Sequence, residues 1–173
     1  MLNLGGKRVI ILVETLYEDI ELWYPYYRLT EEGATVLLAS SGSGLEFKGK
    51  YGYPAKSDLA AKDVNIDEID AILIPGGFAP DYLRRYEVIN NLVKRAFDKG
   101  KIIAAICHGP SVLIDAGILK GKKATSFMAI KVDLINAGAT YLDQEVVQDG
   151  NLITSRKPAD LPAYCKKIIS LLS

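Results

Sequence analysis

Residues 101–110 read KIIAAICHGP, which predicts a buried strand ending at Cys107 and a helix beginning directly after it. The run Ile102–Ile106 is continuously apolar, as is typical of a strand covered on both faces of a parallel sheet. Gly109 and Pro110 favour a tight turn into a first helical turn. Such a strand, turn and helix place one side chain on a sharp elbow at the carboxyl edge of the sheet, where open α/β sheets bind ligands. Cys107 is therefore the candidate nucleophile.

The same alternation of strands and helices extends in both directions from this stretch. Further apolar strand-like runs are Arg8–Val13, Thr35–Ala39 and Ala71–Ile74, and helical patterns cover Glu18–Glu32, Glu87–Lys99 and Pro158–Leu172. Two segments depart from the rhythm. Leu45–Lys56, rich in glycine and aromatics, is typical of a short hairpin or an irregular excursion, and Val146–Thr154, with Asp149-Gly150 between apolar runs, predicts a hairpin. We predict an α/β fold in which residues 1–173 form one domain. Its sheet is of the flavodoxin-like, doubly wound, mostly parallel type, with helices on both faces and small β-hairpin additions.

Composition restricts the function. The chain has 173 residues, 49% of them hydrophobic, and its 21 basic and 21 acidic side chains cancel. A neutral chain is a poor partner for nucleic acid or an anionic membrane, so we expect neither. No apolar run approaches the roughly 20 residues of a membrane span, the N-terminal residues do not resemble a signal peptide, and two cysteines without a pattern favour a reducing compartment. We therefore expect a cytoplasmic protein. A single histidine and two distant cysteines predict no metal site, and we expect no cofactor.

Three groups of residues are candidates for a site with Cys107. His108 is the only imidazole of the chain, and acids in residues 14–19 follow the first strand. Gly76-Gly77 follows the strand Ala71–Ile74, and its backbone N–H groups suit an oxyanion hole together with that of residue 108. The position of Cys107 at a helix N-terminus predicts a thiolate near neutral pH. Structural readings stay open for each: helix capping for the acids, a required turn for the glycines, a buried structural thiol for Cys107.

Cys165 is the contrasting cysteine. It shares one helical face with apolar residues of the predicted last helix, among them Leu161, Ile168 and Leu172. A free cysteine in that setting packs as a small hydrophobic side chain. We predict that Cys165 is structural.

Several motifs in order resemble the ThiJ/PfpI superfamily, and in particular its PfpI-like intracellular cysteine proteases. They are residues 17–21 (YEDIE) leading into 24–26 (YPY), 75–77 (PGG), 106–110 (ICHGP), 125–126 (TS) and 136–138 (NAG). The resemblance covers nearly the whole chain, from about Lys7 to Leu172, and implies a flavodoxin-like sandwich that forms a homodimer or a larger ring such as a hexamer.

The resemblance also implies roles for individual residues. Cys107 is the nucleophile, His108 its base partner, and Glu18 hydrogen-bonds the sulfur. Asp81 corresponds to the acid that orients the histidine, usually from a neighbouring subunit, and the backbone amides of Gly77 and His108 form the oxyanion hole. One departure concerns substrate preference: Phe127-Met128-Ala129 stands where Tyr-Pro-Gly is usual, and Val132 replaces an acid.

Three functions remain open, and all of them use Cys107. The first is a cysteine hydrolase that cleaves peptide or amide carbonyls. The second is a glutathione-independent glyoxalase or protein deglycase, in which Cys107 forms a hemithioacetal with a small 2-oxoaldehyde or its adducts and Glu18 moves protons. The third is a non-enzymatic redox-stress sensor or holdase with a peroxide-reactive thiol. The expected substrate is accordingly a small aldehyde or a peptide, and we rank the hydrolase first.

Overall fold

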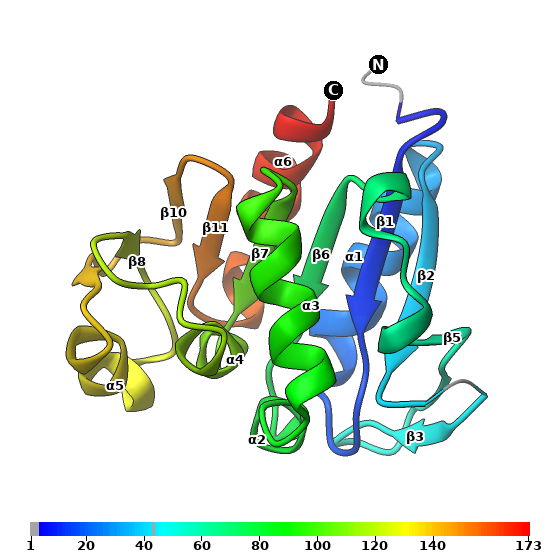
Figure 1. The fold of residues 1–173 in the computed structure, drawn as a ribbon, viewed down its shortest axis with the longest axis horizontal. Helices are drawn as coiled ribbons and strands as arrows, with labels where there is room; N and C mark the ends of the chain where they lie inside the picture. The colour runs from blue at the N-terminus through cyan, green and yellow to red at the C-terminus, as the bar shows by residue number, and fades with distance from the viewer. Residues whose placement is uncertain (1–3, 43) are drawn as a thin grey trace.

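A central seven-stranded sheet organises the molecule (Figure 1). The computed structural model describes residues 4–42 and 44–173. The strand order in this sheet is β10-β11-β7-β6-β1-β2-β5. The strands are β1 (Arg8–Leu12), β2 (Thr35–Ser40), β5 (Leu59–Ala60), β6 (Ala71–Ile74), β7 (Ile102–Ile106), β10 (Val146–Asp149) and β11 (Leu152–Ser155).

The sheet is parallel except at one edge. In the centre, Ile10 of β1 lies opposite Leu37 of β2 on one side and Ile72 of β6 on the other, both in parallel register. Only β10 runs against its neighbour, since it forms a hairpin with β11 through Gly150. These pairings confirm the predicted doubly wound, mostly parallel sheet and the hairpin at Val146–Thr154.

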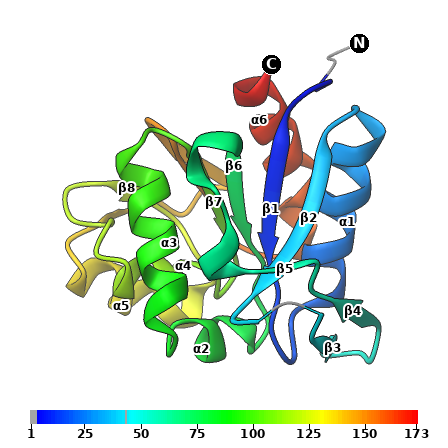
Figure 2. The same cartoon turned by 45° about the vertical axis from the view of Figure 1, so that its right-hand side comes forward.

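Helices cover both faces of the sheet, as Figures 1 and 2 show. One face carries α1 (Asp19–Glu31) and α6 (Leu161–Leu172); the other carries α3 (Glu87–Asp98) and α4 (Pro110–Asp115). Alternate strand residues feed the two cores: Ile11 packs with the α1 and α6 side, and Ile10 with the α3 side. Cys165 lies in the first core with 1% exposure, which agrees with the predicted packing role. Among the described helices, none is both long and apolar enough to cross a membrane.

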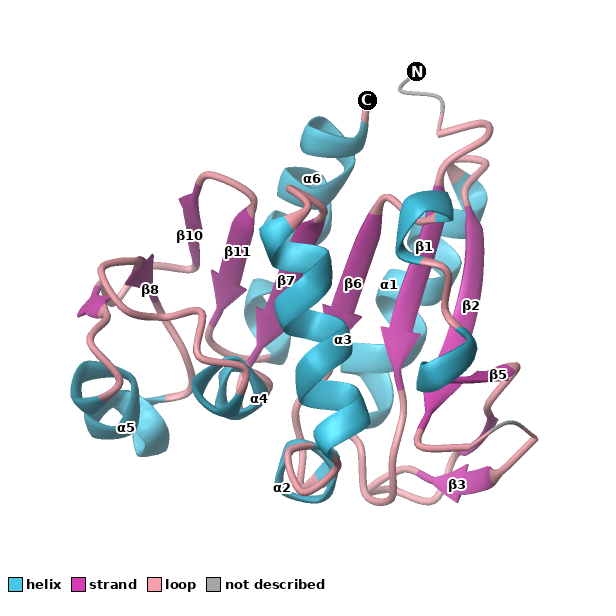
Figure 3. Ribbon diagram, viewed as in Figure 1, coloured by secondary structure: helices cyan, strands magenta, loops and turns pink. Residues whose placement is uncertain are grey.

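Smaller elements surround the sheet (Figure 3). They are the hairpin of β3 (Glu46–Lys48) and β4 (Pro54–Lys56), the parallel pair β8 (Lys123–Ala124) and β9 (Thr140–Tyr141), the helices α2 (Ala79–Leu83) and α5 (Lys131–Asn136), and four 3₁₀ turns at Ala61–Asp63, Ile66–Glu68, Met128–Ile130 and Pro158–Asp160. The β3–β4 hairpin confirms the prediction for Leu45–Lys56. It lies at the same edge of the sheet as α2 and α4, where the central strands end (Figure 1).

Candidate active site

Cys107 occupies the predicted elbow between β7 and α4. Its φ is +61°, a left-handed conformation that costs a non-glycine residue about 1–2 kcal/mol. Two hydrogen bonds hold it there: the Cys107 N–H donates to the Ser155 carbonyl at 3.1 Å, and its carbonyl accepts from the Phe127 N–H at 2.9 Å. A Cβ on Gly109 would lie 2.5 Å from the Ile74 carbonyl oxygen, so the chain can turn this tightly only with glycine there.

Four groups surround the Cys107 sulfur. The Nδ1 atom of His108 lies 3.3 Å from Sγ. The backbone N–H groups of Gly77 and His108 face the sulfur and lower the pKa of the thiol, which is the arrangement expected of amides that could hold an oxyanion. The fourth group is the carboxyl of Glu21: its Oε2 accepts the Gly76 N–H at 2.7 Å, and a Cβ on Gly76 would meet both this oxygen and the Cys107 Cβ within 2.7 Å, which places the carboxyl beside the thiol.

The carboxyl group at the sulfur is thus Glu21, and the expectation that Glu18 fills this place is wrong. Helix phase explains the difference. Glu18 is the N-cap of α1, whereas Glu21 lies almost one turn further along and points inward, with 2% exposure. Glu18 instead forms an ion pair with Lys50 at 3.4 Å. One signal in the sequence could have identified Glu21: an acid on the same helix face as Leu22, Pro25 and Leu29, where an unpaired charge is costly.

Burial sets the protonation of this group of side chains. Desolvation raises the pKa of Glu21 to about 8, against the Gly76 hydrogen bond, which lowers it. Desolvation, followed by the charge of Glu21, raises the pKa of Cys107 to about 12. Burial, and then the charge of Lys50, lowers the pKa of His108. At neutral pH the site therefore holds a thiol, a neutral imidazole and a mostly protonated carboxyl group.

The expected thiolate near neutral pH is therefore wrong for the resting site. Cys107 is 8% exposed, so burial dominates its pKa. The helix that follows, α4, has only six residues, and its N-terminus offers too little positive potential to offset this desolvation. Removal of the thiol proton must accompany the reaction, and the neutral His108 beside the sulfur is placed to accept it.

The orientation of His108 comes from an aromatic ring. Phe127 stacks on the imidazole with the ring centroids 5.1 Å apart and an angle of 30° between the planes. Sequence reasoning marked Phe127 only as an influence on substrate preference.

Asp81, the acid expected to orient His108, lies elsewhere: its side chain is 65% exposed and pairs with Arg85. Within the described part of this chain, no hydrogen bond or ion pair joins Asp81 to His108.

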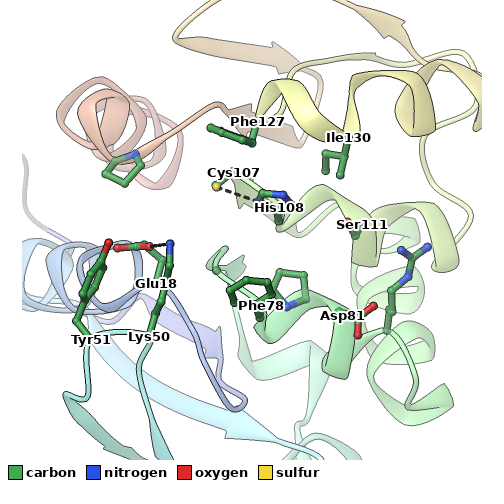
Figure 4. A pocket seen from close by; sticks show the side chains of 14 residues that line it. Glu18, Lys50, Tyr51, Phe78, Asp81, Cys107, His108, Ser111, Phe127 and Ile130 are labelled. Atoms are coloured by element: carbon green, nitrogen blue, oxygen red, sulfur yellow. Dashed lines mark hydrogen bonds and ion pairs between the residues drawn. The ribbon is translucent and has the colours of Figure 1, made fainter.

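Cys107 opens into a pocket of about 550 Å³ (Figure 4). The polar and charged residues that line the pocket are Glu18, Lys50, Asp81, Arg84, His108 and Ser111, and its apolar wall includes Phe78, Phe127 and Ile130. Figure 4 shows Glu18 and Lys50 across the pocket from the sulfur, and Asp81 at its far end. Among the residues that the structure describes, no group of three His, Cys, Asp or Glu side chains could hold a metal ion.

Comparison with known proteins gives consistent matches along the chain. The model of the DJ-1/PfpI family matches residues 7–171. A deglycase of Pyrococcus abyssi is 49% identical over 165 residues, covering 95% of this chain and 99% of that protein. A Bacillus subtilis protein named "Putative cysteine protease YraA" is 44% identical over 96% of this chain and 99% of its own.

A solved structure shares the fold closely. It is a two-domain protein from Anabaena variabilis with a DJ-1/ThiJ/PfpI-like and a ferritin-like domain, with a TM-score of 0.94 and 44% identity. The match covers 96% of this chain and 48% of that one, so this chain spans about half of the two-domain protein.

Proposed function

The chain belongs to the DJ-1/PfpI family, and on that premise we propose that it is a cysteine-dependent deglycase. It acts on adducts that a 2-oxoaldehyde such as methylglyoxal forms with an amine or a thiol, and it releases that amine or thiol and a 2-hydroxy acid. The placement of the buried Glu21 carboxyl beside the Cys107 thiol, both against Gly76, carries the proposal. It joins a nucleophile to a proton-transfer group whose pKa lies near working pH.

In the first step, the C–N bond of the adduct breaks as its hydroxyl proton passes to the amine nitrogen, which gives a free amine and an aldehyde. The Cys107 sulfur then adds to the aldehyde carbon. The thiol proton passes through Nδ1 of His108, 3.3 Å away, to the new oxygen, and a hemithioacetal forms. The amides of Gly77 and His108 stabilise the negative charge that develops on this oxygen.

In the second step, Glu21 in its carboxylate form removes the proton from the carbon that bears sulfur. The hydroxyl proton of the hemithioacetal passes to the ketone oxygen, and Glu21 returns the proton it removed to the neighbouring carbon, so that the former ketone becomes an alcohol and the hemithioacetal a thioester. Water then cleaves the C–S bond, which yields the 2-hydroxy acid and the original thiol. The sum is adduct plus water giving amine plus 2-hydroxy acid, with no net oxidation.

The name of the Pyrococcus abyssi relative supports this reading over the hydrolase that the sequence alone ranked first. A cysteine peptidase is the second candidate, favoured by the Cys107–His108 pair and by the name of the YraA relative. That chemistry needs an acid to orient His108. The Asp81 side chain, paired with Arg85, is 65% exposed and so accessible to His108 of a second copy in a homo-oligomer, and we propose such a shared site.

A side-by-side assay tests the proposal. Purified protein is incubated with free methylglyoxal, with its adducts of Nα-acetyl-lysine and N-acetyl-cysteine, and with a panel of fluorogenic peptides. We expect lactate from the aldehyde and both adducts, and none with Cys107→Ala. Peptide cleavage that depends on Cys107, without lactate formation, would refute the deglycase and support the peptidase.

A further inference from the structure

The ion pair between Glu18 and Lys50 has no part in the steps above, yet it lies in the active-site pocket. The Lys50 Nζ is 3.4 Å from the Glu18 Oε2, and both residues line the pocket that Cys107 enters (Figure 4). The Glu18 side chain is 12% exposed and that of Lys50 is 40% exposed. The largely buried carboxylate of Glu18 therefore lines the pocket and is paired with the partly exposed ammonium group of Lys50.

The carboxylate of Glu18 does not cap helix α1, although its position at the start of that helix suggests this role. Glu18 is the N-cap of α1, but its side chain makes no capping hydrogen bond. The backbone is fixed independently, because the Glu18 N–H donates to the Gly76 carbonyl at 3.1 Å, beside the β-bridge between Tyr17 and Gly77. The carboxylate is thus held rigidly from its backbone while its charge is directed at the pocket.

Lys50 reaches Glu18 from a turn that is equally well fixed. Its N–H donates to the Tyr17 carbonyl at 2.8 Å, and the Asp19 carboxylate accepts the N–H groups of Tyr51 and Tyr53 at 2.9 and 3.0 Å. The flexible part is the side chain alone. A partly exposed lysine ion pair contributes little to stability, so a competing cation can displace it.

The other charged groups of the pocket are engaged differently. Arg84 makes two hydrogen bonds of 2.8 Å to Asp115, and Asp81 pairs with Arg85 at the exposed end. Glu18 is therefore the well-buried carboxylate of the pocket whose partner is a single, partly exposed ammonium group.

We propose that Glu18 is the specificity-determining residue that binds the amine part of the substrate, which gains positive charge as the C–N bond breaks, and that Lys50 occupies this subsite in the empty enzyme. The inference rests on the proposed deglycase function and deepens it. Adducts of amine side chains would be preferred over adducts of thiols. Only an amine adduct places against Glu18 a nitrogen that becomes cationic when the amine is released. Lys50 would compete with the substrate and return to Glu18 after the amine leaves.

The test compares two substrates in four proteins: wild type, Glu18→Gln, Lys50→Met and Glu46→Gln, the last a control that removes an exposed carboxylate outside this pocket. The measured quantity is the ratio of kcat/KM for the Nα-acetyl-lysine adduct to that for the N-acetyl-cysteine adduct. Loss of one charge-assisted contact predicts a roughly tenfold lower ratio in Glu18→Gln. Lys50→Met should lower KM for the lysine adduct, and Glu46→Gln should match the wild type.

A binding measurement gives a second readout that needs no turnover of adducts. Unmodified Nα-acetyl-lysine should slow alkylation of Cys107 by iodoacetamide in the wild type, more so in Lys50→Met, and much less in Glu18→Gln. An unchanged ratio and unchanged protection in a folded Glu18→Gln protein, while free methylglyoxal is still converted, would overturn the inference and leave the deglycase proposal intact. If the wild type converts neither methylglyoxal nor the adducts, the proposed function itself fails, and protection by Nα-acetyl-lysine still decides whether Glu18 binds amines.

Discussion

Glu21 reaches the sulfur of Cys107 through space that residue 76 leaves by having no side chain. A Cβ on Gly76 would lie 2.5 Å from the Glu21 Oε2 and 2.7 Å from the Cys107 Cβ. We predict that Gly76→Ala separates acid from thiol, destabilises the fold by about 1–3 kcal/mol through overpacking, and reduces methylglyoxal turnover far more than its stability loss explains. Gly150→Ala is the control: its φ is +60°, but its Cβ meets no atom, so only stability should change. Full turnover in a folded Gly76→Ala protein would contradict the assigned contact.

Glu21→Gln should retain a hydrogen-bonding group of similar size and lose proton transfer. General acid–base groups contribute about 10²- to 10⁴-fold to a rate, and we expect lactate formation from methylglyoxal to fall within that range. Alkylation of Cys107, followed by mass spectrometry, should persist and so establish that the nucleophile is intact. Turnover near the wild-type rate would remove Glu21 from the mechanism.

The raised pKa of Glu21 also predicts how stability depends on pH. Between its ordinary value of 4.5 and about 8, the native carboxyl keeps a proton that the unfolded chain has released. Raising the pH through this window therefore favours unfolding, by roughly 5 kcal/mol at most at 1.36 kcal/mol per pKa unit. Denaturant unfolding at several pH values should show this decline in the wild type and a much flatter profile in Glu21→Gln. Equal slopes for the two proteins would show that Glu21 ionises normally.

Iodoacetamide should modify Cys107 before Cys165 in the native protein. Burial raises the pKa of both thiols to about 12, so access decides. Cys107 is 8% exposed and opens into the pocket, whereas Cys165 is 1% exposed within the core. Mass spectrometry after brief labelling measures the order, and faster modification of Cys165 would contradict the assignment of the nucleophile.

A complementation experiment tests the shared site proposed for Asp81. Cys107→Ala and Asp81→Ala subunits, each of low activity alone, are refolded together. A mixed interface pairs an intact Cys107 with an intact Asp81, so that turnover should return. The contrary result is mixed oligomers, verified by mass, that stay inactive; Asp81 then acts within its own chain or has no part in turnover.

The sequence predicts the fold well because a short continuous run of apolar residues is compatible with few structures other than a buried strand. The strands Ala71–Ile74 and Ile102–Ile106 end at the predicted residues, and helix Glu87–Asp98 differs from its prediction by one residue. The same reasoning finds Cys107 and His108, since an elbow after a buried strand depends on local sequence alone.

The remaining features of the site depend on tertiary structure. Whether Glu18 or Glu21 meets the sulfur is decided by the rotation of α1 about its axis; the motif at residues 17–21 leaves this rotation open, and the apolar face of the whole helix indicates it. The protonated state of Cys107 follows from burial by residues distant in sequence, and the stacking of Phe127 on His108 follows from the path of the segment after β8. The role proposed for Asp81 requires a second copy of the chain.

The left-handed backbone conformation of Cys107 is imposed when the protein folds, and it is already in place when the chemical reaction begins. Ser155 on β11 and Phe127 hold this one residue from two distant parts of the chain. The sulfur is consequently fixed when the protein folds, and the bound substrate meets a nucleophile that needs no reorientation. Such preorganisation reduces the entropy that is lost on reaching the transition state in each turnover. The backbone strain that it requires is introduced once, during folding.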